Sequence, residues 1–302
     1  MGQKIIQVIL ILIVSPFLFG LINKTKAFFA GRKGPPVLQL YYDIFKLFRK
    51  GVTYSKTVSF IFILGPIISL ACSIIGLLIM PLGKYPSIFS FNGDFILLIY
   101  LFAMGRFFTV IAALDTGSSF EGMGASREVQ FALFAEPALF LSIIALVKLS
   151  GETSLTGILS KSIFSINGLL NPVIYLIVAT IFIVFLAENC RIPVDDPNTH
   201  LELTMIHEVM VLDHGGVDFG FILYNSALKF WILGSFIAGL FSSIFSFGLF
   251  ADILIFISIM FLLSIIVGIV ESVLARLRLL KVPYFLMIGL GLSFISLIIS
   301  LR

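Results

Sequence analysis

Residues 187–208 read AENCRIPVDDPNTHLELTMIHE and form the densest polar segment of a chain that is otherwise almost continuously apolar. In the sequence, Arg191 is the one cation among many acidic side chains between residues 187 and 218. Such a concentration of like charge is costly unless it is solvated, protonated or met by cations from elsewhere. Pro193 and Pro197 stiffen the segment and argue against a merely solvated loop. The acidic residues are Glu188, Asp195, Asp196, Glu202, Glu208, Asp213 and Asp218, and the histidines are His200, His207 and His214.

The composition around this segment is that of an integral membrane protein. Of 302 residues, 59% are hydrophobic and 12% are charged, whereas an ordinary soluble domain has about 25% charged residues. Eight apolar runs approach the length of roughly 20 residues that a bilayer core requires. We therefore predict an all-α protein, a single transmembrane domain over residues 1–302. The predicted spans are residues 3–23, 57–82, 94–114, 129–149, 170–187, 219–246, 248–270 and 282–301.

The distribution of lysine and arginine predicts the orientation. Thirteen of the 20 fall on the side of the loops at 24–56 and 188–218, and five fall on the other side. Short positively charged loops face the cytoplasm. We therefore expect a multi-pass protein of the cytoplasmic membrane with both termini outside. Lys4 precedes the first run but no small-residue cleavage site follows it, so we expect a retained span rather than a signal peptide.

An amphipathic helix is predicted over residues 36–50, after a stiff turn at Gly34, Pro35 and Pro36. Its apolar residues recur at helical spacing and its polar residues fall on the opposite face, so it should lie along the membrane surface. Two interpretations stay open: a helix that only associates with lipid, or one that covers a cavity and turns its cations toward the acidic loop. The apolar face includes Val37, Tyr41, Ile44 and Phe48, and the polar face includes Gln39, Asp43, Lys46 and Lys50.

Three charged residues lie deep inside predicted spans rather than near their ends. Arg106 is halfway along the third span, where a charge costs at least about 2.5 kcal/mol, so we expect it to face the bundle and to be paired. Glu136 is followed by Pro137, whose missing N–H leaves a free carbonyl one turn earlier and favours a buried water. Lys229 lies in the sixth span. Glu136 is therefore either a proton carrier or a simple partner of Arg106 or Lys229.

The connection between the third and fourth spans reads DTGSSFEGMGASRE over residues 115–128. Its small residues predict a flexible or close-packed connection. A phosphate-binding loop is excluded because no strand precedes it. We expect no nucleic-acid partner, since the net charge of +4 follows from membrane orientation alone.

Two motifs carry a resemblance to a known family. The pattern A-E-x-x-R-x-P-x-D-x-P from Ala187, followed by Glu202 and Leu203, resembles the long loop of the H-type membrane subunit of respiratory complex I. The wording RIPVDDPNTHLELTMIHE is more similar to the equivalent subunit of membrane-bound nickel-iron hydrogenases and formate hydrogenlyases. The first loop matches the complex I pattern at Arg32, Gly34, Pro35, Gln39, Asp43, Lys46 and Leu47, and Arg127 and Glu136 match its spacing of nine residues.

The resemblance implies a non-catalytic subunit of an oxidoreductase complex, which docks a soluble arm and couples its redox reaction to proton or sodium translocation. The implied partners are a nickel-iron large subunit, a small iron-sulfur subunit and antiporter-like membrane subunits. Arg32, Lys33, Asp43, Lys46, Arg127, Arg191, Asp196, His200 and His207 are the implied docking residues. The residues expected to couple ion movement are Arg106, Asp115, Glu136, Glu188, Asp195, Glu202, Glu208 and Lys229.

No cofactor or metal site is expected in this chain itself. An iron-sulfur cluster needs about four thiolates, and the sequence has only Cys72 and Cys190. The nickel-iron centre and the iron-sulfur clusters would therefore reside in partner subunits. Complex I subunits carry glutamates at the positions of Asn198 and His200, and this difference favours a ferredoxin- or formate-driven complex over a quinone-reactive one. A stand-alone ion-coupled transporter and a plain membrane anchor are two further functions that the sequence leaves open.

Overall fold

The computed structural model describes residues 2–161, 171–196, 205–244 and 248–301. Seven helices in these ranges are long and apolar enough to cross a membrane, and α7, with 17 residues, is a shorter apolar helix. At about 1.5 Å per residue α7 is near the lower limit for a span. The all-α class and the eight predicted spans are thus confirmed in outline. The long helices are α1 (Gly2–Phe29), α3 (Phe60–Ile79), α4 (Asp94–Asp115), α5 (Ser119–Ser150), α7 (Pro172–Glu188), α8 (Gly216–Ser242), α9 (Leu249–Val273) and α10 (Val282–Ser300).

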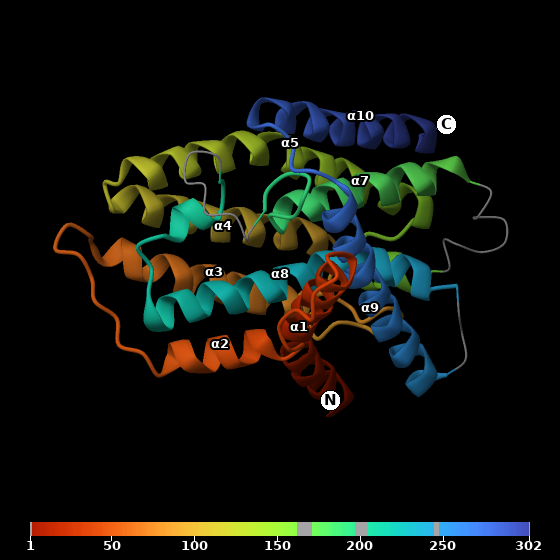
Figure 1. Cartoon of the computed structure of the whole chain (residues 1–302). Coiled ribbons are helices and arrows are strands. Elements are labelled where there is room, and N and C mark those ends of the chain that lie inside the picture. Colours follow the sequence, from red (N-terminus) through yellow and green to blue (C-terminus); the bar gives the residue numbers. More distant parts are fainter. Residues whose placement is uncertain (1, 162–170, 197–204, 245–247, 302) are drawn as a thin grey trace.

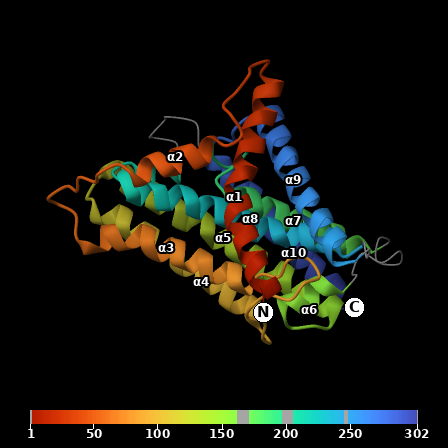
Figure 2. The same ribbon diagram turned by 90° about the horizontal axis from the view of Figure 1, so that it is seen from below.

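The helix α8 is the centre of the bundle. Within its apolar stretch 72% of the residues are buried, against 28% in α4 and in α10. It packs against α3, α9, α1 and α7, and Figure 1 shows α1 and α9 crossing the other long helices at a steep angle. The two chain ends lie on the same side of the molecule in Figure 2. The described parts of the polar connection between α7 and α8, residues 189–196 and 205–215, lie at the opposite end of the bundle, where Asp213 N–H donates to Glu121 near the start of α5.

The segment after α1 folds back along that helix. A side chain at Gly20 would collide with the carbonyl of Val37, so α2 (Gln39–Phe48) begins beside the middle of α1 and then packs on α8. The nine residues of α1 that follow Gly20 extend about 14 Å further. We call residues 21–36 the α1 tip. Arg32 and Lys33 are exposed there, and so are the rings of Phe28 and Phe29.

Two tyrosines hold α1 at its internal proline. Pro16 has no N–H to donate to the carbonyl of Leu12. The hydroxyl of Tyr224 in α8 donates to that carbonyl at 3.0 Å, and Tyr41 in α2 donates to the carbonyl of Ile13. The freed acceptor is therefore satisfied by a neighbouring helix, as a membrane span requires.

Several predicted boundaries differ from the structure by three residues or more. The expected amphipathic helix is present as α2 but covers only Gln39–Phe48, because Pro36 and Leu38 form a turn before it. The predicted fourth span begins ten residues too late, since α5 starts at Ser119 and the connection from α4 is a short turn with Gly117 at φ +68°. Gly124 lies within this helix, and its position requires glycine because a side chain there would collide with Val209. Of the two predicted alternatives, a flexible or a close-packed connection, the structure agrees with close packing at Gly124, and residues 119–128 belong to α5.

Candidate functional site

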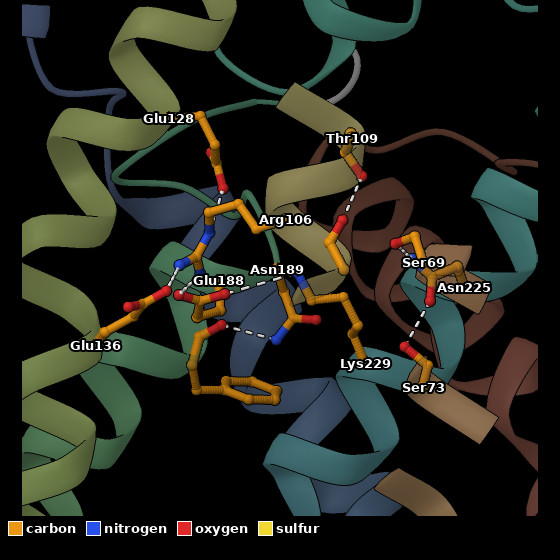
Figure 3. A network of polar contacts seen from close by, with 12 residues as sticks. Ser69, Ser73, Arg106, Thr109, Glu128, Glu136, Glu188, Asn189, Asn225 and Lys229 are labelled. Atoms are coloured by element: carbon orange, nitrogen blue, oxygen red, sulfur yellow. Dashed lines mark hydrogen bonds and ion pairs between the residues drawn. The ribbon is translucent and has the colours of Figure 1, made fainter. Parts of the chain in front are cut away.

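Arg106 joins three carboxylates inside the bundle. Its Nε donates to Glu128 Oε1 at 3.1 Å, its Nη1 contacts Glu136, and its Nη2 contacts Glu188. Lys229 Nζ lies 3.6 Å from Glu188 Oε2 and adds a second cation. Figure 3 shows these side chains converging from α4, α5, α7 and α8. We call these five residues the Arg106 cluster, and its pairing agrees with the expectation that Arg106 faces the bundle.

The cluster runs from the interior to the lateral surface of the bundle. The side chains of Arg106 and Glu188 are 7% and 8% exposed, whereas that of Glu136 is 36% exposed. On the same helix, Leu133 and Phe140 are exposed and share a face with Glu136 at helical spacing. Glu136 is therefore the member of the cluster that faces outward, on an otherwise apolar surface.

A cavity of about 250 Å³ lies beside the cluster. Arg106, Glu188 and Lys229 line one part of its wall, and apolar side chains from α1, α2 and α8 line another part. At about 30 Å³ per molecule the space would accommodate several waters. The polar connection contributes Asn189, Cys190, Arg191, His207, Glu208 and His214 to the lining.

A hydrogen-bonded chain of uncharged groups continues the polar wall. Asn225 in α8 donates to Ser69 at 2.8 Å and accepts from Ser73 at 2.5 Å, both in α3. Figure 3 shows this group beside the Arg106 cluster. Asn225 and Ser69 also line the cavity, so polar groups follow its wall from α7 across to α3.

A second group of buried charges includes Arg191, the arginine of the polar connection. Arg191 Nη1 lies 3.3 Å from Glu271 Oε1 in α9, and Lys26 Nζ in α1 lies 2.9 Å from Glu271 Oε2. The guanidinium of Arg191 also lies 4.3 Å from the centre of the Phe19 ring. We call Lys26, Arg191 and Glu271 the Glu271 cluster. Because Arg191 is buried, it is not available at the surface of this chain.

Asp195 fastens both ends of the polar connection. Its Oδ2 accepts the N–H groups of Ile206 and His207 at 3.0 and 3.3 Å, and its Oδ1 pairs with Arg276 at 2.7 Å. The carboxylate therefore links described residues that precede and follow positions 197–204. The predicted residues His200 and Glu202 belong to that stretch and lie outside the described residues.

The other predicted residues are distributed between the cavity, the surface and the ends of helices. His207 and Glu208 line the cavity, and Arg127 in α5 donates to the carbonyl of Met205 at 2.7 Å. Asp115 ends α4, where its Oδ2 accepts the N–H of Ser59 at 2.6 Å. On α2, Asp43 accepts from Gln39 at 2.9 Å. Lys46, like Arg32 and Lys33, is exposed, and Asp196 is partly buried.

Burial changes the proton affinity of two groups that line the cavity from the polar connection. Burial lowers the pKa of His214 to about 4, and its ring stacks on Phe62 with centroids 3.9 Å apart. His214 is thus neutral at pH 7, unlike an exposed histidine near its usual pKa. Burial also raises the pKa of the Cys190 thiol well above its usual value.

Sequence reasoning missed Glu128 and Glu271 as parts of the site. Glu271 carried a usable signal, because it is an acidic residue in an otherwise apolar run, as Glu136 is. Glu128 carried none, since it was interpreted as part of a connection rather than as part of the third turn of α5. Arg276 was likewise counted only for orientation, and its pairing with Asp195 depends on the fold.

Comparisons with known proteins agree with the fold. The family model described as NADH dehydrogenase matches residues 3–301. Hydrogenase-4 component C of Escherichia coli (strain K12) is 29% identical, with 95% of this chain and 91% of that protein covered. Formate hydrogenlyase subunit 4 of the same organism is also 29% identical, with 97% and 96% covered. A subunit of the NADH-quinone oxidoreductase of Caulobacter vibrioides is 27% identical, with 69% and 64% covered.

A solved structure shares the fold over nearly the whole chain. It belongs to the membrane-bound sulfane sulfur reductase, an archaeal respiratory membrane complex, and superposes with a TM-score of 0.81. The sequences are 24% identical, and 99% of this chain and 98% of that chain are covered. At this identity the likeness concerns the fold alone.

Proposed function

The chain belongs to the NADH dehydrogenase family, and on this premise we propose that it is the membrane subunit of a complex I-like membrane-bound hydrogenase. It docks a soluble arm and couples the redox reaction of that arm to proton or sodium translocation. The names of its relatives in E. coli, a hydrogenase component and a formate hydrogenlyase subunit, support the hydrogenase class. In this proposal the chain spans the cytoplasmic membrane with both termini outside.

The Arg106 cluster is the observation that carries this proposal. It connects the cavity behind the polar connection to the lateral face at Glu136 through paired side chains. A plain membrane anchor has no need of five charged residues within a bilayer, where each is costly. An ion pathway does need them, because a proton or cation must find charged or polar groups along its route. The cluster thus supplies the first part of a pathway inside this chain.

The exposed side of Glu136 favours a second membrane subunit beside α5. A carboxylate between Leu133 and Phe140 would contact lipid tails unless another protein covered it. An antiporter-like membrane subunit with a polar group facing Glu136 would satisfy it and continue the pathway. The face of α5 with Leu133, Glu136 and Phe140 is therefore the proposed site of that contact.

The end of the bundle away from the two chain ends supplies a surface for the soluble arm. The α1 tip exposes Arg32 and Lys33 together with the rings of Phe28 and Phe29. Aromatic and arginine side chains are enriched in protein interfaces. Arg191 and Asp195 instead hold the polar connection in place from within. We propose docking by the exposed cations of the tip and of α2, with a nickel-iron large subunit and a small iron-sulfur subunit as partners.

Purification in mild detergent tests the proposal most directly. We expect the chain to copurify with soluble and membrane partners, and the complex to contain nickel and iron. Inverted vesicles with this complex should accumulate protons or sodium when an electron donor is supplied. A lone, metal-free protein that catalyses solute uptake in liposomes would instead support a stand-alone transporter.

Charge reversal at the α1 tip tests docking separately. Arg32→Glu with Lys33→Glu should release the soluble arm while the membrane subunit stays folded, because both side chains are exposed. The difference from the unsubstituted complex should be largest at low salt, since salt screens both the original attraction and the repulsion that the two glutamates introduce. Lys161→Glu, an exposed cation of the other end of the bundle, is the matched control. Retention of the soluble arm by the double variant on a sizing column would contradict the docking role.

The cavity keeps a quinone-reactive subunit as a second candidate. It combines apolar walls from α1, α2 and α8 with polar groups at Asn225 and His207, a lining that suits a small amphipathic ligand. The relative in Caulobacter vibrioides is named for an NADH-quinone oxidoreductase. Electron transfer from the complex to an added short-chain quinone, lost on Asn225→Leu, would favour this candidate over the hydrogenase.

A further inference from the structure

Residues 188–191 carry one member of each buried charge cluster. Glu188 belongs to the Arg106 cluster and Arg191 to the Glu271 cluster. All four residues of this segment line the cavity. The position of the segment therefore sets both the cavity wall and the place of Glu188.

The segment is a helix end with an unusual residue at its turn. Arg191 N–H donates to Leu186 O at 2.8 Å, and Cys190 N–H donates to Ala187 O at 3.1 Å. These are the two hydrogen bonds of a Schellman motif, in which glycine normally occupies the left-handed position. Here Cys190 occupies it with φ +51°. The left-handed conformation is disfavoured for a residue with a side chain, so the motif needs support from outside.

Glu271 supplies that support from α9. Its side chain is fully buried and pairs with Arg191 at 3.3 Å. The place of Glu271 is itself fixed, because one turn earlier Gly268 packs so closely on Thr25 of α1 that a side chain there would collide. Lys26 follows Thr25 and pairs with Glu271 at 2.9 Å. The contact between α1 and α9 therefore holds the carboxylate that holds Arg191.

We propose that Glu271 is a positioning residue: by holding Arg191 it keeps the Schellman turn closed and Glu188 between Arg106 and Lys229. Glu271 itself carries no ion in this role and acts only through Arg191. The inference rests on the proposed function to the extent that the Arg106 cluster takes part in ion movement. The place of residues 188–191, however, can be measured without any assay of ion movement.

Cys190 is a reporter inside the segment. The thiol is partly buried, and burial raises its pKa, so its reaction with a maleimide is slow at neutral pH because the thiolate is the reactive form. Opening of the turn would expose the thiol and accelerate the reaction. Cys72 is the one other cysteine of the chain, so in the Cys72→Ala variant any label found on this subunit, once it is separated from its partners after the reaction, is on Cys190.

The test compares Glu271→Gln with Glu152→Gln in the Cys72→Ala chain, within the purified complex. Glu152 makes the same kind of pair with Lys161 at 3.0 Å, but at the surface, so it is a matched control. We expect Glu271→Gln to accelerate labelling of Cys190 by N-ethylmaleimide about tenfold, as for the loss of a local closed state, and to reduce ion uptake about as much. Glu152→Gln should change neither.

An unchanged labelling rate in Glu271→Gln would overturn the proposal, even if ion uptake fell. If that variant does not assemble, Glu271→Asp keeps the charge, shortens the reach to Arg191 and should label at an intermediate rate; labelling at the unsubstituted rate would overturn the proposal equally. Failure of the proposed function looks different. In that case the unsubstituted complex translocates no ion, while the labelling rates still report whether Glu271 holds the segment.

Discussion

The two halves of α8 run through the same bundle but make opposite kinds of contact. From Gly216 to Lys229 the helix faces the cavity, with Asn225 and Lys229 in its wall. From Phe230 onward it is packed by apolar side chains: Phe230 lies 4.7 Å from Phe185 between ring centres, and Trp231 lies 6.2 Å from Phe256. The change occurs between adjacent residues, so an ion that reaches Lys229 cannot continue along α8.

The direction left open to an ion in the cavity is sideways. Charged side chains from Glu188 through Arg106 to Glu136 lead toward the lateral face of α5. The apolar half of α8 closes the straight route across the membrane. In the proposed function an ion in the cavity would therefore leave beside α5, which suits a subunit that passes an ion to a neighbour.

The largest effect is expected from removal of the central cation. Arg106→Gln leaves the carboxylates of Glu128, Glu136 and Glu188 with Lys229 as the one cation of the cluster, and breaking the pair with the buried Glu188 costs about 3 to 5 kcal/mol. We expect loss of folded subunit, measured as the yield of monodisperse protein in mild detergent. Arg106→Lys keeps one charge and should recover part of the yield. A normal yield of Arg106→Gln would show that folding of the subunit does not depend on the pairing of Arg106.

Glu136→Gln should separate ion movement from assembly. Arg106 keeps two carboxylate partners in this variant, so the subunit should fold and assemble. The proton-carrying group at the lateral face is lost, and we expect a loss of ion uptake by inverted vesicles of about a hundredfold or more, within the range for loss of a proton-transfer group. Normal uptake, or failure only through loss of the assembled complex, would leave Glu136 as a structural partner of Arg106.

His214 should make the folded protein less stable in acid. Its pKa is about 4 in the folded protein and 6.5 in the unfolded chain, so only the unfolded chain gains a proton as the pH falls from 6.5 toward 4. Stability is complete above pH 6.5 and falls by up to about 3 kcal/mol across this window. His214→Phe should keep the stacking on Phe62 and remove this part of the pH dependence. The melting temperatures of both proteins at pH 5 and pH 7.5 check this prediction. An equal change in melting temperature between the two pH values in both proteins would contradict it.

The smallest effect is expected at the other end of the bundle. Lys161 and Glu152 form a pair with side chains 52% and 43% exposed. Exposed pairs contribute about 0 to 1 kcal/mol. Lys161→Gln should therefore lower the melting temperature slightly and leave ion uptake unchanged. A loss of folded protein as large as that of Arg106→Gln would show that burial does not determine how much an ion pair contributes to stability.

Hydropathy along the chain is enough to establish the membrane class and most helix limits. It is a local property, and a bilayer demands about 20 apolar residues from each span independently of the others. For this reason α4 at Asp94–Asp115 and α10 at Val282–Ser300 agree with the predicted runs to within one residue. The cost of a buried charge is local as well, so the sequence also indicated that Arg106 needs a partner.

The identity of the partners, in contrast, depends on how the helices pack. Arg106 meets Glu188 across 82 positions of sequence and Arg191 meets Glu271 across 80. Such pairings depend on the rotation and tilt of each helix, which packing between small residues sets: Gly268 on Thr25 brings α9 to α1, and Gly124 brings α5 to the segment of Val209. A spacing of residues along one helix does not contain this information. The sequence of a single helix therefore indicates that a buried charge such as that of Arg106 needs a partner. The contacts between helices decide which residue that partner is.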